Sequence, residues 1–316
     1  MFEISTAAGL AVKISAVGAT VCSIRLDGQE LTLGYASEAA YASDPYYLGS
    51  TVGPYANRIH NAGFQLGQQQ VRLTANDGPH CLHGGKAGLN HRQWQLEAQQ
   101  ADQLILSCRA AAGEGGFPGN REFRCQFRVT ATELQLQFEA TTDAPTVLSL
   151  TNHCYFNLDP QAGPVDQHSL QSPLLQVLEK DGSGIPTGRL LSCAEQYPQL
   201  ATGQLLQDLF RQHGALDHCF VVPYGDKQLQ TLARLTSPDQ QLSLTVLSDL
   251  PGLQIYSGDG LGAPFLPRQG ICLEAQYWPD APNQPDFPAT LLLPGQIYQQ
   301  QIIYRFARQN GADSND

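Results

Sequence analysis

Alternation of apolar and polar residues with a period of two is the dominant pattern along this chain. From Phe123 to Ala131 every odd position is apolar and every even position is polar, and Leu134 to Ala140 repeats the pattern after a short turn. Such alternation is typical of strands with one buried and one wet face, so we predict an antiparallel hairpin here. Further strands are expected over Leu104–Ala110, Val147–Phe156, Gln241–Leu247, Ile271–Trp278 and Tyr298–Phe306.

Helical periodicity is scarce. The best candidate helix is Gln204–Gln212, where four apolar residues form a stripe with helical spacing. The chain contains no fixed-period repeat and no Ser/Gly-rich linker. We therefore predict an all-β fold, a single large antiparallel β-sandwich with long loops and few short helices. One domain is expected over residues 1–307, and the polar segment 308–316 is expected to be a frayed, disordered tail.

Charge and cysteine usage narrow the functional classes. The 316 residues include 18 Lys and Arg against 29 Asp and Glu, a formal net charge of −11, which argues against a nucleic-acid binder. No stretch has the length of uncharged apolar sequence that a membrane helix needs, and Met1–Ser5 has no features of a secretion signal. The eight cysteines show no C-x-x-C spacing, so a zinc ribbon or thioredoxin-type motif is not expected. Several of them, such as Cys108 and Cys125, fall at apolar positions of alternating runs, so we predict buried, reduced thiols and a cytoplasmic protein.

Two segments in the first third of the chain combine glycine with polar side chains. In Gly53–Ile59, Arg58 fits a surface cation or a structural ion pair as well as a functional group. In His80–Gly85, two histidines three residues apart could ligate a metal, but no third ligand follows at a familiar spacing. The glycine pair after His83 indicates close backbone approaches, as in a tight turn or the wall of a site.

Two predicted strands carry unlike polar groups. On a strand over Thr151–Leu158, Thr151, His153 and Tyr155 would share one face. On Ile271–Trp278, Glu274, Gln276 and Trp278 would share a face. A carboxylate, an amide and an indole together are suited to a sugar, although an ordinary solvent-facing strand gives the same pattern.

Taken in order, these segments resemble the aldose 1-epimerases, the galactose mutarotase family. The resemblance extends from about the first strand to Phe306, and seven ordered motifs make it specific. The motifs are Thr51–Ile59, Leu82–Gly85, Gly116–Asn120, Thr151–Leu158, Asp217–Phe220, Gln254–Gly258 and Leu273–Pro285.

The resemblance implies a galactose mutarotase-like supersandwich and interconversion of the α and β anomers of free aldohexoses such as D-galactose and D-glucose. It implies no metal and no organic cofactor. By motif, Glu274 is similar to the general base and His153 to the general acid. The residues similar to substrate-binding groups are Arg58, His83, Asp217, Asn57 and Gln276. The expected partner is a small sugar, without nucleic acid or membrane, and the chain could be a monomer or a homodimer.

The resemblance has two departures, and both fall on the expected rim of the pocket. Pro54 stands where many relatives have another residue, often Arg, and Asp259–Gly260 stands where many have Asn and an aromatic residue. Both departures could alter sugar preference, and neither affects the expected acid–base pair.

Ordinary pKa values suggest how the pair would work. A glutamate with a reference pKa of ~4.3 is ionised at neutral pH, and a histidine with a pKa of ~6.5 is partly protonated. A neighbouring carboxylate, Asp217 or Glu274, would raise that protonated fraction for His153.

Three rival functions remain. A hexose-6-phosphate epimerase would need more basic residues, since Arg58 is the only one in the site motifs. A glycosidase would need a second carboxylate. A non-catalytic sugar-binding protein could dispense with the acid–base pair.

Overall fold

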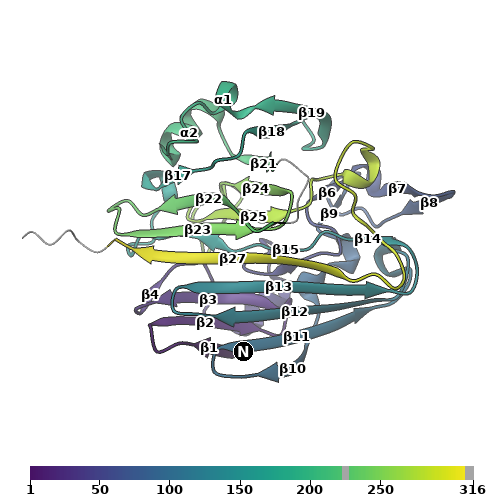
Figure 1. Cartoon of the computed structure of the whole chain (residues 1–316), viewed down its shortest axis with the longest axis horizontal. Coiled ribbons are helices and arrows are strands. Elements are labelled where there is room, and N and C mark those ends of the chain that lie inside the picture. The colour runs from purple at the N-terminus through teal and green to yellow at the C-terminus, as the bar shows by residue number, and fades with distance from the viewer. Residues whose placement is uncertain (223–227, 310–316) are drawn as a thin grey trace, which may run out of the picture.

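Three antiparallel sheets form most of the molecule in the computed structural model, which describes residues 1–222 and 228–309. The first sheet has nine strands, in the spatial order β10 (Gln95–Gln99), β11 (Gln103–Ala110), β12 (Arg121–Val129), β13 (Glu133–Thr142), β27 (Tyr298–Arg308), β23 (Leu242–Ser248), β22 (Gln230–Thr236), β17 (Ser169–Gln171) and β20 (Gln204–Leu205). Most of these strands are stacked in Figure 1.

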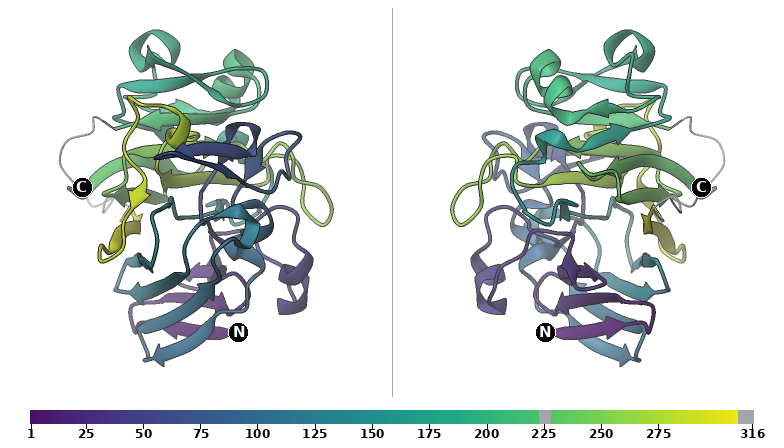
Figure 2. Two further views of the ribbon diagram at one scale, coloured as in Figure 1. Left: turned by 90° about the vertical axis from the view of Figure 1, so that its right-hand side faces the viewer. Right: turned by 90° about the vertical axis from the view of Figure 1, so that its left-hand side faces the viewer.

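Two smaller sheets accompany it. A six-stranded sheet has the order β16 (Tyr155–Phe156), β25 (Ile271–Gln276), β24 (Gly252–Tyr256), β21 (Asp217–Val221), β18 (Gln176–Lys180) and β19 (Pro186–Ser192). A four-stranded sheet has the order β1 (Phe2–Ser5), β2 (Leu10–Ser15), β3 (Thr20–Leu26) and β4 (Gln29–Glu30). Figure 2 shows this N-terminal sheet facing β10–β13.

One hydrophobic core joins the three sheets. It contains Val12 of β2, Phe127 of β12, Val246 of β23 and Leu273 of β25, each at most 1% exposed. Burying a side chain of this size stabilises the fold by roughly 1.5–3 kcal/mol. The sheets therefore form one β-sandwich, as the alternation predicts.

The predicted hairpin is confirmed. β12 and β13 pair over nine residues from Arg121↔Thr142 to Val129↔Leu134, and alternate side chains of β12 enter the core. The predicted helix is also confirmed: α2 (Leu206–His213) buries Leu206, Leu209 and Phe210, and it begins two residues later than expected because Gln204–Leu205 forms β20. Among the described residues, the other α-helix is the short α1 (Cys193–Gln196), which lies near α2 and β19 in Figure 1.

The prediction of one continuous strand over Val147–Phe156 is wrong. The segment contains parts of three short strands, β14 (Thr146–Val147), β15 (Thr151–Asn152) and β16. β15 pairs with β5 (Thr51–Val52), whereas β16 pairs with β25, so the chain changes partners around His153. The backbone of His153 instead donates to the Ser50 carbonyl and accepts from the Gly49 amide. The prediction that Thr151, His153 and Tyr155 share one face of a strand is therefore wrong, because Thr151 and Tyr155 lie on different strands.

Three further expectations can be compared with the structure. Strand β27 includes Arg308, one residue past the expected end of the domain, and residues 310–316 of the expected tail lie outside the described residues. All eight cysteines are buried and free, as predicted. Across residues 1–222 and 228–309, no helix combines the length and apolar character needed to cross a membrane.

Candidate active site

The site residues come from neighbouring strands of the six-stranded sheet and from two loops beside it. Glu274 lies on β25, the second strand of this sheet, directly opposite Gln254 of β24. Asp217 begins β21, the next strand, and Lys180 ends β18, the strand after that. His153 lies just before β16, which pairs with β25 on its other side. The sheet order thus brings together residues that are up to 121 positions apart, as Glu274 and His153 are.

The predicted acid and base lie next to each other. His153 Nε2 is 3.6 Å from Glu274 Oε1, and both side chains are at most 5% exposed. Cys272 Sγ lies 3.5 Å from His153 Nδ1, on the other side of the ring. All six residues of β25 are buried, so the alternative of a solvent-facing strand is excluded.

The protonation expected from ordinary pKa values does not hold at this pair. Burial raises the pKa of Glu274 well above its usual value, and Asp217 raises it further. Burial lowers the pKa of His153 to about 4, although Asp217 and a backbone hydrogen bond act in the opposite direction. Both groups therefore favour their neutral forms, because each charge would lose its hydration. The neutral pair contains as many protons as the ion pair, and one proton transfer separates the two.

His83 forms the wall of the site next to His153. The two imidazole rings are 5.5 Å apart and nearly perpendicular. His83 Nδ1 accepts a hydrogen bond from the backbone N–H of Asn57. Because Nδ1 is an acceptor, the ring proton of neutral His83 lies on Nε2. Burial lowers the pKa of His83 well below its usual value, and His153 and Arg58 lower it further.

The glycines after His83 are required by close backbone approaches, as the sequence indicates. Gly84 has φ +86°, and a Cβ there would lie 2.5 Å from the Gly53 carbonyl oxygen. Gly85 has φ +56°, and a Cβ there would lie 2.7 Å from the Thr74 carbonyl oxygen. The loop thereby packs against the Gly53–Pro54 turn and fixes His83 next to Asn57.

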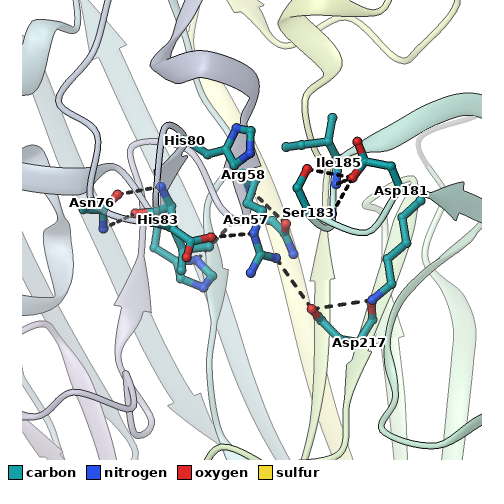
Figure 3. Close-up of polar contacts among 12 residues, drawn as sticks. Asn57, Arg58, Asn76, His80, His83, Asp181, Ser183, Ile185 and Asp217 are labelled. Carbon is teal, nitrogen blue, oxygen red and sulfur yellow. Dashed lines mark hydrogen bonds and ion pairs between the residues drawn. The ribbon is translucent and has the colours of Figure 1, made fainter.

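Arg58 is the centre of an ion-pair network at the edge of the site. It lies on β6 (Arg58–Ile59), which pairs with β9 (Cys81–Leu82) immediately before His83. Arg58 Nε donates to Asp77 Oδ2 at 2.7 Å, and Nη1 is 3.5 Å from Asp217 Oδ2. Figure 3 shows the guanidinium directed toward Asp217. Arg58 is therefore an ion-paired residue placed within the predicted site.

Asp217 is held at both carboxylate oxygens. Gln254 Nε2 donates to Oδ1 at 2.6 Å, while Arg58 and Lys180 lie near Oδ2. Asn57 lines the same small recess as these four residues. The other predicted residue, Gln276, is buried on β25 and its side chain donates to the Tyr277 carbonyl. No contact described for Gln276 joins it to the other predicted site residues.

Three buried oxygens near the acid–base pair have no hydrogen-bond partner among the described residues. They are Glu274 Oε2, Gln254 Oε1 and Gln276 Oε1. Buried acceptors are almost always satisfied in folded proteins, so each unsatisfied one requires an explanation. Together they would suit a ligand that offers several hydroxyl donors.

Residues 1–305 match the family model for aldose 1-epimerase. The chain belongs to the aldose 1-epimerase family. It is 33% identical to the aldose 1-epimerase of Escherichia coli, over 95% of this chain and 92% of that protein. It is 31% identical to human galactose mutarotase, over 94% and 91% of the two chains.

Solved structures of the family agree with the fold. The aldose epimerase homologue of C. elegans superposes with a TM-score of 0.92 at 29% identity, covering 98% of this chain and 99% of that one. Galactose 1-epimerase from Lactobacillus acidophilus gives 0.86 at 25% identity, covering 98% and 94%. The architecture is thus the galactose mutarotase fold, as predicted.

The predicted acid–base pair is also part of a group that could hold a metal. One ligand atom each from His153, Cys272 and Glu274 lies within 4.8 Å of the others. Burial raises the pKa of the Cys272 thiol well above its usual value, and Glu274 raises it further. Since metals bind the thiolate, this environment opposes coordination. The pair of histidines His80 and His83 is not part of such a group among the described residues.

Two departures from the family pattern can now be placed. Pro54 is buried against Gly84, where a Cβ on that glycine would lie 2.6 Å from Pro54 Cδ. The Asp259 side chain accepts from Ser257 Oγ and lies 3.8 Å from Arg268 Nε. Asp259 is therefore engaged with its own loop rather than with the acid–base pair.

Sequence reasoning missed three residues of the site. Gln254 lies inside a family motif, but its role depends on its position opposite Glu274, which only strand pairing reveals. Asp77 and Lys180 lie outside every motif, and nothing in the sequence distinguishes them from surface charges. A hollow of about 890 Å³ on β10–β13 contains none of the site residues, and its arginines Arg92, Arg109 and Arg124 are each paired with a glutamate.

Proposed function

We propose that this protein is an aldose 1-epimerase that interconverts the anomers of free aldohexoses such as D-galactose and D-glucose, with Glu274 as the base and His153 as the acid. The observation that carries the proposal is the 3.6 Å approach of these two buried groups. The anomeric hydroxyl O1 and the ring oxygen O5 are bonded to the same carbon. The groups that serve them must therefore lie within a few ångström of each other.

Ring opening transfers two protons in the same step. Glu274, as carboxylate, takes the proton from O1, and the electrons of the O1–H bond form the C1 carbonyl. The C1–O5 bond breaks, and O5 takes a proton from protonated His153. The products are the open aldehyde, neutral Glu274 and neutral His153. The aldehyde then rotates about C1–C2, and the reverse transfers close the ring on the opposite face.

The buried environment supports this cycle because the pair keeps the same number of protons throughout. Burial favours the neutral pair, which is the protonation state that accompanies the open-chain sugar. The carboxylate–imidazolium state that opens the ring differs from it by one proton transfer. Each positioned acid or base contributes about 10²–10⁴-fold to a rate. Two such groups are sufficient for a reaction that already proceeds in water, so the mechanism requires no metal or organic cofactor.

Substrate binding is proposed for Arg58, His83, Asp217, Asn57, Gln276 and, in addition, Gln254. The unsatisfied oxygens of Gln254 and Gln276 would accept sugar hydroxyls, and the neutral His83 ring offers its Nε2 proton as a donor. A small-sugar partner is proposed on the same basis. A cytoplasmic location is proposed because all eight cysteines are buried and free.

Polarimetry tests the proposal directly. Fresh α-D-galactose and α-D-glucose are dissolved with the purified protein, and the decay of optical rotation is compared with the decay in buffer. The proposal predicts a rate proportional to protein concentration. Rates equal to the buffer rate from a folded protein would contradict it, and faster conversion of the 6-phosphates would favour the rival hexose-6-phosphate function.

A further inference from the structure

Lys180 lies at the edge of the site, outside the set of residues that the family motifs indicate. Its Nζ donates to the backbone carbonyl oxygen of Asp217 and lies 3.7 Å from Asp217 Oδ2. We propose that Lys180 is a positioning residue that holds Asp217 in place for sugar binding. This inference rests on the proposed function.

Strand geometry explains why a side chain is needed at this point. The ladder between β18 and β21 pairs Gln176 with Val221 and Val177 with Phe220. Continued in the same register, it would place Lys180 opposite Asp217, but the described pairing does not extend that far. The lysine ammonium bonds the Asp217 carbonyl where backbone pairing has ended, and it thereby ties the start of β21 to the end of β18.

The charges of the network also require a second cation. The Arg58 guanidinium is shared between Asp77, at 2.7 Å, and Asp217, at 3.5 Å. Without Lys180, two carboxylates would compete for one guanidinium, and the closer one is Asp77. The Lys180, Asp217 and Arg58 side chains are 27%, 33% and 18% exposed, so water screens these contacts only in part.

The position of Asp217 matters because its carboxylate contacts Gln254. Its Oδ1 accepts from Gln254, the residue opposite Glu274. Gly184, in the turn between β18 and β19, packs on Arg58. A Cβ on Gly184 would lie 3.1 Å from Arg58 Nη1. Figure 3 shows Ser183 and Ile185, on either side of Gly184, hydrogen-bonded to Asp181. Lys180 thus acts on the sugar through Asp217 and Gln254, without being a catalytic residue.

The test measures sugar affinity and turnover separately. Lys180→Met keeps the length of the side chain and removes its charge. We expect a loss of about tenfold in galactose affinity, by calorimetry and in KM, with kcat changed less than about twofold. Lys180→Arg should restore most of the affinity. The matched control is Lys13→Met, which removes an exposed ion pair with Glu3 and should change neither quantity.

A double-mutant cycle with Asp217→Asn shows whether Lys180 acts through Asp217. We expect Lys180→Met to weaken binding less than about twofold in the Asp217→Asn background. The bond from Lys180 to the backbone carbonyl of residue 217 is kept there, but the carboxylate that it would hold for the sugar is already gone. Equal losses in both backgrounds, or unchanged affinity in folded Lys180→Met, would overturn the inference. Calorimetry requires no turnover, so a wild type that binds galactose without accelerating mutarotation would contradict the proposed function alone.

Discussion

Replacement of Glu274 by glutamine is the most informative perturbation of the proposed mechanism. The substitution keeps the volume and planarity of the side chain and removes its ability to accept a proton. A second carboxylate, Asp217, lies nearby but is bonded by Gln254 and flanked by two cations, so it is poorly suited to replace the base. We therefore expect kcat to fall by at least about 10²-fold, the lower bound for a positioned base. This loss corresponds to roughly 2.7 kcal/mol of transition-state stabilisation.

The same substitution should not destabilise the fold. Burial raises the pKa of Glu274 in the folded state, so the folded chain keeps this proton to higher pH than the unfolded chain does. This difference in proton binding disfavours folding above the unfolded-state pKa. An amide does not titrate, so Glu274→Gln should leave the melting temperature unchanged or raise it.

The assay is polarimetry on fresh α-D-galactose after subtraction of the buffer rate, with thermal melting as a check on folding. Glu139→Gln is the matched control, because Glu139 lies on β13, in the hollow of the nine-stranded sheet outside the site. A folded Glu274→Gln protein with near-normal rates would refute the assignment of the base.

Three other predictions address the acid, the binding residues and pH. His153→Asn should lower kcat about as much as Glu274→Gln, and an effect on KM alone, again by polarimetry, would redirect the search for the acid to His83. Substitution of Arg58 by Met or Asp217 by Asn should raise KM more than it lowers kcat, and an unaltered KM in both would argue against their binding role. Burial lowers the pKa of His168 to about 4, so below about pH 6.5 the unfolded state binds the extra proton and stability falls by up to roughly 3 kcal/mol by pH 4. His168→Gln should reduce this dependence in urea unfolding measured from pH 7 to pH 4, and identical slopes would contradict the reasoning.

The regular strands of the fold could be predicted because their side chains alternate between core and solvent. In β12 and β13 each side chain reports the face on which it lies, so the pattern suffices to identify the hairpin. The sequence of β25 does not indicate which face each side chain lies on, because both faces of this strand are buried. The region around His153 could not be predicted either, since its backbone bonds to the Gly49–Ser50 loop, about 100 residues earlier in the chain.

The site was predictable only in part for a similar reason. Family motifs identify residue types such as Glu274 and His153, but protonation depends on burial, which reverses the states expected from reference pKa values. Lys180 and Asp77 acquire their importance from partners on other strands. From the sequence alone, a charged residue in a loop or at a strand end that pairs with a distant partner cannot be distinguished from one that faces only solvent.

A crystal structure of Glu274→Gln soaked with galactose would test the central claim most directly. The account predicts a pyranose whose anomeric hydroxyl lies within hydrogen-bond distance of residue 274 and whose ring oxygen faces His153 Nε2. A sugar bound elsewhere, or one whose ring oxygen is turned away from His153, would contradict it.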